Sequence, residues 1–113
     1  MESAKARKFL EEGCDLYEKG DVERAGASFL QAAKLGNAEA QVNLANLYSD
    51  GSLQSADGDA KAEHWYKLAV KKRVPEAAYN LAVHHKQRNN LARYRYWIRR
   101  AAALGDEDAA ALV

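Results

Sequence analysis

Apolar residues recur along this chain at intervals of three and four, and the pattern itself is repeated. A starting residue is followed by a large apolar side chain four residues later, by small or aliphatic residues seven and eight later, and by a final position eleven later. Successive copies are offset by 37 and 32 residues: Ala25, Phe29, Ala32, Ala33 and Gly36; Ala62, Tyr66, Ala69, Val70 and Arg73; Tyr94, Ile98, Ala101, Ala102 and Gly105. We call this pattern the ladder. Such spacing predicts packed helical repeats, because small residues let neighbouring helices approach closely.

Turn signals divide the chain into segments of helix length. Gly20-Asp21, Asp50-Gly51 and Asn89-Asn90 can end helices, and Pro75 suits the first turn of another. We therefore expect an all-α fold, a right-handed α-α superhelix (solenoid) of three helix-turn-helix repeats in a single domain, 1–113. The repeats cover about 4–36, 37–73 and 74–105, and a half-repeat over 106–113 is expected to cap the C-terminal end.

Charge is segregated along the chain, although the net charge is only +1. Residues 1–66 hold 7 basic and 12 acidic side chains, whereas residues 67–105 hold 10 basic side chains and one acidic, Glu76. Such segregation bears on the choice of partner and not on the fold. The first eight residues contain no apolar block, and Cys14 is the single cysteine. These features predict a cytoplasmic protein with no disulfide and no membrane association.

The second and third copies of the ladder resemble a known family. Lys61-Ala62, Trp65-Tyr66 and Ala69-Val70 are similar to the second-helix signature of Sel-one-like repeats, a branch of the tetratricopeptide superfamily, and the first-helix signature appears at Ala40, Leu44, Ala45 and Tyr48. Trp97, Ile98, Arg100, Ala101-Ala102 and Gly105 are similar again. The loop from Asp50 to Asp59 departs from that branch in its spacing. The resemblance implies a solenoid that acts as an adaptor or scaffold and binds a protein or peptide in a concave groove.

Register against the family assigns the residues of this groove. They are Tyr17, Glu39, Val42, Asn46, Ser49, Glu76, Tyr79, Val83 and Lys86, with Cys14, Glu18 and Gln87 at neighbouring positions. Some tetratricopeptide domains clamp a terminal carboxylate with lysines and asparagines. Asn43, Asn46 and Lys86 are of the right type, but the position of Val42 lacks the lysine, so no such clamp is predicted.

A basic patch is the alternative working surface. Its candidate residues are Lys71, Lys72, Arg73, Arg88, Arg95 and Arg99. Interleaved cations and aromatics over 93–100 superficially suit nucleic acid. However, Tyr94 and Trp97 occupy packing positions of the ladder, so we expect this patch to be a solvated face or to bind an acidic protein, and nucleic acid is the less favoured partner. The acidic half of another copy could also bind there, giving self-association.

Residues for catalysis or metal binding are not evident. His84 and His85 are adjacent and project about 100° apart on a helix, and His85 occupies the register of Tyr48, which predicts a packing role. No histidine or cysteine pair has the spacing of metal ligands, and no nucleophile or phosphate-loop motif is present. The sequence therefore predicts a non-catalytic protein without metal or cofactor.

Overall fold

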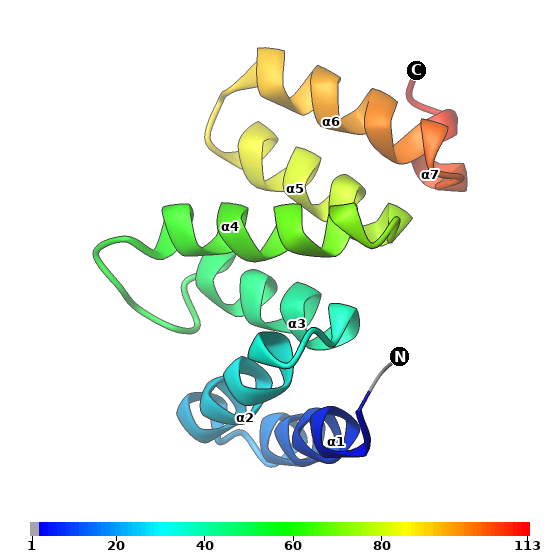
Figure 1. Ribbon diagram of the computed structural model, residues 1–113. Helices are drawn as coiled ribbons and strands as arrows, with labels where there is room; N and C mark the ends of the chain where they lie inside the picture. The colour runs from blue at the N-terminus through cyan, green and yellow to red at the C-terminus, as the bar shows by residue number, and fades with distance from the viewer. Residues whose placement is uncertain (1–2) are drawn as a thin grey trace. The chain divides into compact units, whose positions relative to one another are not determined.

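The computed structural model describes residues 3–113, which form seven α-helices and no strand (Figure 1). The helices are α1 (Ala4–Glu18), α2 (Val22–Lys34), α3 (Ala38–Ser49), α4 (Gly58–Lys71), α5 (Pro75–Gln87), α6 (Leu91–Ala103) and α7 (Glu107–Ala110). Helices that follow one another pack as pairs, namely α1 with α2, α2 with α3, α5 with α6, and α6 with α7. The prediction of an all-α array of helical repeats is confirmed, and the hand of a superhelix stays a prediction.

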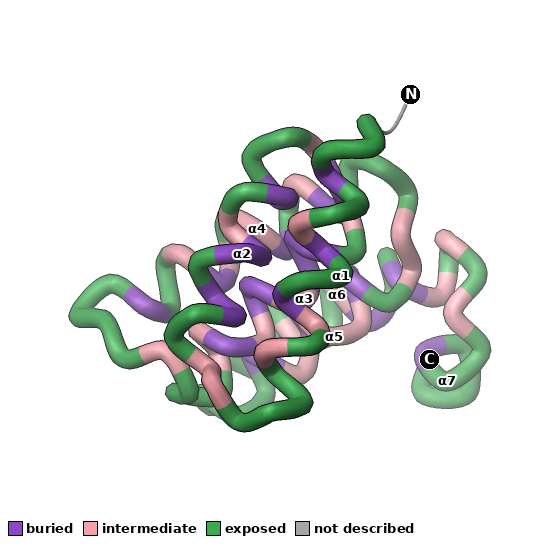
Figure 2. The backbone as a smooth tube through the Cα atoms, turned by 90° about the horizontal axis from the view of Figure 1, so that it is seen from below, coloured by how far each residue is buried: buried purple, intermediate pink, exposed green. Residues whose placement is uncertain are grey.

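Contacts within the chain define two compact units, which divide between Trp65 and Tyr66 inside α4. The first unit holds α1, α2, α3 and the start of α4, and the second holds the rest of α4 with α5, α6 and α7. Buried and exposed positions alternate along the helices in both units (Figure 2). This alternation is the periodicity that the ladder predicts.

Three corners between helices share one arrangement, a glycine followed by an aspartate or asparagine. Gly20, Gly36 and Gly105 have φ of 85°, 94° and 106°, a left-handed conformation that glycine adopts without strain. The next residue caps the following helix: the side chain of Asn37 accepts a hydrogen bond of 2.7 Å from the Ala40 N–H, and Asp106 accepts one of 2.8 Å from the Ala109 N–H. The last position of the ladder is therefore a turn position and not a packing position.

The corner at Arg73-Val74 has neither of these favourable residues. Arg73 has φ of 63°, and Val74 occupies the cap position with no side-chain hydrogen bond. Arg73→Gly is expected to raise the free energy of unfolding by about 1 kcal/mol, because a non-glycine residue is strained in this conformation. Urea unfolding measures the change. Lys72→Gly, one residue earlier and without positive φ, should lower stability; equal effects of the two substitutions would show that the backbone at Arg73 is not strained.

The core of the first unit is built by the first copy of the ladder. Phe29 is 3% exposed and lies among Leu10, Ala25, Ala32, Ala33, Ala40, Leu44 and Leu47. Gly13 of α1 faces the Phe29 ring so closely that a Cβ at this position would lie 2.6 Å from two ring carbons. The loop before α4 is attached to this core by Leu53, which lies against Gly26 of α2. The absence of a side chain at Gly13 thus lets the Phe29 ring lie close to α1, and its absence at Gly26 lets the loop at Leu53 lie close to α2.

The core of the second unit contains both adjacent histidines. Tyr66, Leu81 and Ile98 are fully buried there. His85 is buried, which confirms its predicted packing role, and His84 is buried as well, with its ring 6.2 Å from that of Tyr66. Tyr94 and Trp97 are half-buried. The short helix α7 packs on α6 and buries Ala109.

Candidate binding cleft

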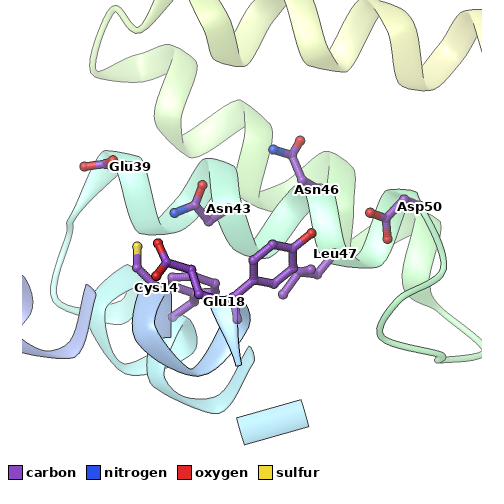
Figure 3. A pocket seen from close by; sticks show the side chains of 9 residues that line it. Cys14, Glu18, Glu39, Asn43, Asn46, Leu47 and Asp50 are labelled. Carbon is purple, nitrogen blue, oxygen red and sulfur yellow. The ribbon is translucent and has the colours of Figure 1, made fainter. Parts of the chain in front are cut away.

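A cleft with a volume of about 380 Å³ opens between α1 and α3 in the first unit (Figure 3). Two of its wall residues, Phe29 and Leu47, are only 3% exposed and supply apolar surface. The other wall residues carry polar groups. The complete lining is Cys14, Tyr17 and Glu18 from α1, Phe29 from α2, Glu39, Asn43, Asn46 and Leu47 from α3, and Asp50 after its end.

The polar wall on α3 is one stripe of the helix. Glu39, Asn43, Asn46 and Asp50 follow one another at spacings of four, three and four, which keeps them on the same face. Figure 3 shows them along α3, with Cys14 and Glu18 facing them from α1. Two carboxamides therefore lie between two carboxylates, over a helix length of about 16 Å at 1.5 Å per residue.

The cleft is electronegative. Its lining includes three carboxylates, Glu18, Glu39 and Asp50, and no lysine, arginine or histidine. Partial burial raises the pKa of the Cys14 thiol, and the carboxylates of Glu39 and Glu18, followed by those of Asp15 and Glu11, raise it further. The same negative potential that opposes a thiolate at Cys14 attracts a cationic group of a ligand.

The reactivity of Cys14 is expected to report this potential. The rate of its alkylation by iodoacetamide, measured against pH, should give an apparent pKa above that of a free cysteine, and Glu39→Gln should lower it. Since the folded-state pKa is raised, the thiol favours the folded state below the pKa of an unfolded cysteine, and this contribution is lost as pH rises through the folded pKa. Glu23→Gln on α2 is the control and should change nothing. An apparent pKa at or below that of free cysteine would contradict an electronegative cleft.

In the first unit, some of the residues assigned to the groove line the cleft and others do not. Tyr17, Glu39 and Asn46 line the cleft, together with Cys14 and Glu18. The assignment of Val42 is wrong, because this side chain is only 3% exposed. On a helix with 3.6 residues per turn, Val42 lies about 100° away from Asn43, outside the narrow stripe that α3 leaves open. Ser49 is half-buried and does not line the cleft.

The other predicted groove residues lie on α5, in the second unit. Glu76, Tyr79, Val83 and Lys86 share one face of this helix, with Glu76 and Lys86 exposed and the other two half-buried. The ammonium group of Lys86 lies 5.1 Å from the centre of the Tyr94 ring. None of the four lines the α1–α3 cleft.

All six predicted basic-patch residues are exposed. Lys71, Lys72 and Arg73 lie at the C-terminal end of α4, and Arg88 follows α5 and donates a hydrogen bond of 3.1 Å to the His84 carbonyl. Arg95 and Arg99 lie one turn apart on α6. Arg88 thus has a structural role at the end of α5. Arg95 and Arg99 make the exposed face of α6 a cationic surface.

Four lining residues have no groove assignment from the sequence: Phe29, Asn43, Leu47 and Asp50. Asn43 has the residue type of a carboxylate clamp, which the sequence does not otherwise predict. The signal that could have found Asn43 and Asp50 is the spacing of the polar residues on α3, since Glu39 and Asn46 lie on the same stripe. A buried wall residue such as Phe29 gives no such signal, because its register matches that of an ordinary core residue.

Within residues 3–113, no group of three or more histidine, cysteine, aspartate or glutamate side chains is arranged to hold a metal ion. Over the same residues, no helix is both long enough and apolar enough to cross a membrane. No protein-family model matches the chain, and a search of curated proteins finds no sequence that matches it.

Proposed function

We propose that this chain is a non-catalytic adaptor that binds a protein or peptide partner, and that the α1–α3 cleft is its binding site. The observation that carries the proposal is the composition of the cleft, in which apolar, carboxamide and carboxylate groups from neighbouring helices line one opening. Resemblance of the ladder to Sel-one-like repeats supports the same function. The single cysteine of the sequence, Cys14, is consistent with a cytoplasmic location.

Each kind of wall residue has a part in binding an extended peptide. The carboxamides of Asn43 and Asn46 can both donate to and accept from a peptide backbone. The carboxylates of Glu18, Glu39 and Asp50 can accept hydrogen bonds from lysine or arginine side chains, and such charge-assisted bonds are worth about 1.5–3 kcal/mol each. Phe29 and Leu47 provide apolar contact. The preferred ligand is therefore a peptide with at least one basic residue.

A selection experiment tests this function. Short random peptides displayed on phage are selected on the immobilised chain, and the recovered peptides are synthesised and measured by calorimetry. We expect enrichment of lysine and arginine, and binding about tenfold weaker to the double variant Asn43→Ala, Asn46→Ala, a loss of about 1.4 kcal/mol. The control is Gln31→Ala with Gln54→Ala, which removes two exposed carboxamides outside the cleft. Equal binding to the wild type and the Asn43, Asn46 variant would contradict the proposal.

The second candidate function is anion or nucleic-acid binding through α6. It is favoured by one observation: this helix carries four arginines and no acidic residue. Binding of a labelled single-stranded oligonucleotide should then fall steeply with salt and should be lost in Arg95→Gln, Arg99→Gln. We favour the cleft because Trp97 is half-buried and contacts the Tyr96 ring edge to face, with ring centres 5.0 Å apart, so less of its ring is open to stacking by a base.

A further inference from the structure

The exposed face of α6 has the composition of a binding surface. Arg95, Arg99 and Arg100 are exposed, and Tyr96 is 51% exposed among them. Arg100 donates a hydrogen bond of 3.0 Å to the Tyr96 hydroxyl, and its guanidinium lies 5.7 Å from the centre of the Trp97 ring. These contacts hold the tyrosine and one arginine in place before any partner binds. Tyrosine and arginine are the residues that most often dominate the energy of protein interfaces.

The cleft and the α6 face are complementary in charge. The cleft has three carboxylates and no cation in its lining, and α6 has four arginines and no carboxylate in its sequence. The cleft also holds Tyr17, which is 50% exposed and can accept an arginine over its ring. Because the net charge of the chain is only +1, two copies do not repel each other strongly as whole molecules.

We infer that the α6 face of a second copy of this chain occupies the cleft. This inference rests on the proposed function, since it names the partner of the same site. Tyr96 of one copy enters the cleft of the other against Phe29 and Leu47, while Arg95 and Arg99 meet Glu18 and Glu39. The interface joins two different surfaces, so in a dimer one copy keeps a free cleft and the other keeps a free α6 face, and the assembly can grow beyond a dimer.

Ionic strength controls this association. Charges on the rims of the cleft and of α6 are solvent-exposed, and their attraction is screened beyond about 10 Å at 0.1 M salt and beyond about 3 Å at 1 M. The chain is therefore studied by sedimentation velocity at low salt, from about 1 µM to about 1 mM, which covers weak and moderate affinities. We expect the average mass to rise with concentration, to exceed that of two chains, and to return to that of one chain in 1 M salt.

Two variants separate the two surfaces. Glu18→Gln with Glu39→Gln neutralises the cleft, and Arg95→Gln with Arg99→Gln neutralises the α6 face. Each variant alone should associate at least about tenfold more weakly than the wild type. Mixed together, they should form a complex of two chains and nothing larger, because only one native cleft and one native α6 face remain in the mixture. Glu23→Gln with Lys34→Gln, two exposed residues of α2, is the control and should associate as the wild type does.

Two outcomes would overturn the inference: a wild-type mass that stays at one chain throughout, or association that the cleft and α6 variants do not weaken. Tyr96→Ala gives a further test that leaves charge unchanged, and it should also weaken association. Failure of the self-association inference is distinguishable from failure of the proposed peptide-binding function. A monomeric chain that still binds selected basic peptides in its cleft rejects the second copy as the partner and leaves peptide binding in place.

Discussion

Glu39→Lys is expected to weaken the binding of a selected basic peptide by about tenfold or more. The substitution places a cation in a cleft whose lining otherwise has none, beside the carboxylates of Glu18 and Asp50. A basic ligand then loses one attractive partner and gains a repulsive one, and a tenfold loss corresponds to about 1.4 kcal/mol. Isothermal titration calorimetry at fixed salt measures the change in the dissociation constant.

Glu23→Lys is the matched control for this substitution. Glu23 and Glu39 are both the second residue of a helix, and both are exposed, so reversal of either charge costs the same favourable interaction with the helix dipole, about 0.3–1 kcal/mol. Of these two glutamates, Glu39 lines the cleft and Glu23 does not. Glu23→Lys should therefore leave peptide binding within about twofold of the wild type. Similar losses from both substitutions would mean that the net charge of the chain, and not the cleft, governs binding.

Gly13→Ala is expected to destabilise the chain by about 1–3 kcal/mol, the usual penalty of overpacking a core. Alanine is the better helix former by about 1 kcal/mol, so helix propensity alone predicts the opposite sign. The structure reverses this expectation, because the new Cβ would lie 2.6 Å from the ring of Phe29, which is rigid and 3% exposed. The ring can move only by disturbing the packing between α1 and α2. Urea unfolding followed by circular dichroism gives the magnitude.

Gly26→Ala provides the comparison within the same unit. Its Cβ would lie 2.7 Å from a methyl carbon of Leu53, which is the end of a flexible side chain on a surface loop. Leu53 can change rotamer or shift with its loop, so the loss of stability should be clearly smaller than for Gly13→Ala. A Gly13→Ala chain that is as stable as the wild type, or more stable, would contradict the close packing of α1 against the Phe29 ring.

The ladder explains why much of the fold could be predicted from the sequence. Ala25, Phe29 and Tyr66 recur at fixed offsets because each must fit the same kind of helix-to-helix contact, and all three are buried. The corner at Gly20-Asp21 was also predictable, since a glycine followed by a cap residue has few other uses in a helical chain. Local chemistry determines these features, so sequence alone suffices.

The features that could not be predicted depend on packing between segments far apart in sequence. By register, Val42 is predicted to be an exposed groove position, but α3 is buried around most of its circumference and Val42 lies on the buried part, with 3% of its surface exposed. His84 is buried beside Tyr66, although polarity alone favours an exposed position. In the sequence, Leu53 is a lone apolar residue in a polar loop, and the residue that it packs against, Gly26, lies on α2.

The most direct measurement on the cleft is an NMR titration of the isotope-labelled chain with a selected basic peptide. Binding in the cleft predicts that the side-chain amide signals of Asn43 and Asn46 shift, together with backbone signals of α1 near Tyr17, and that these shifts saturate at the dissociation constant found by calorimetry. Shifts confined to α5 or to Arg95 and Arg99 of α6, with the two asparagine signals unchanged, would contradict the α1–α3 cleft as the binding site.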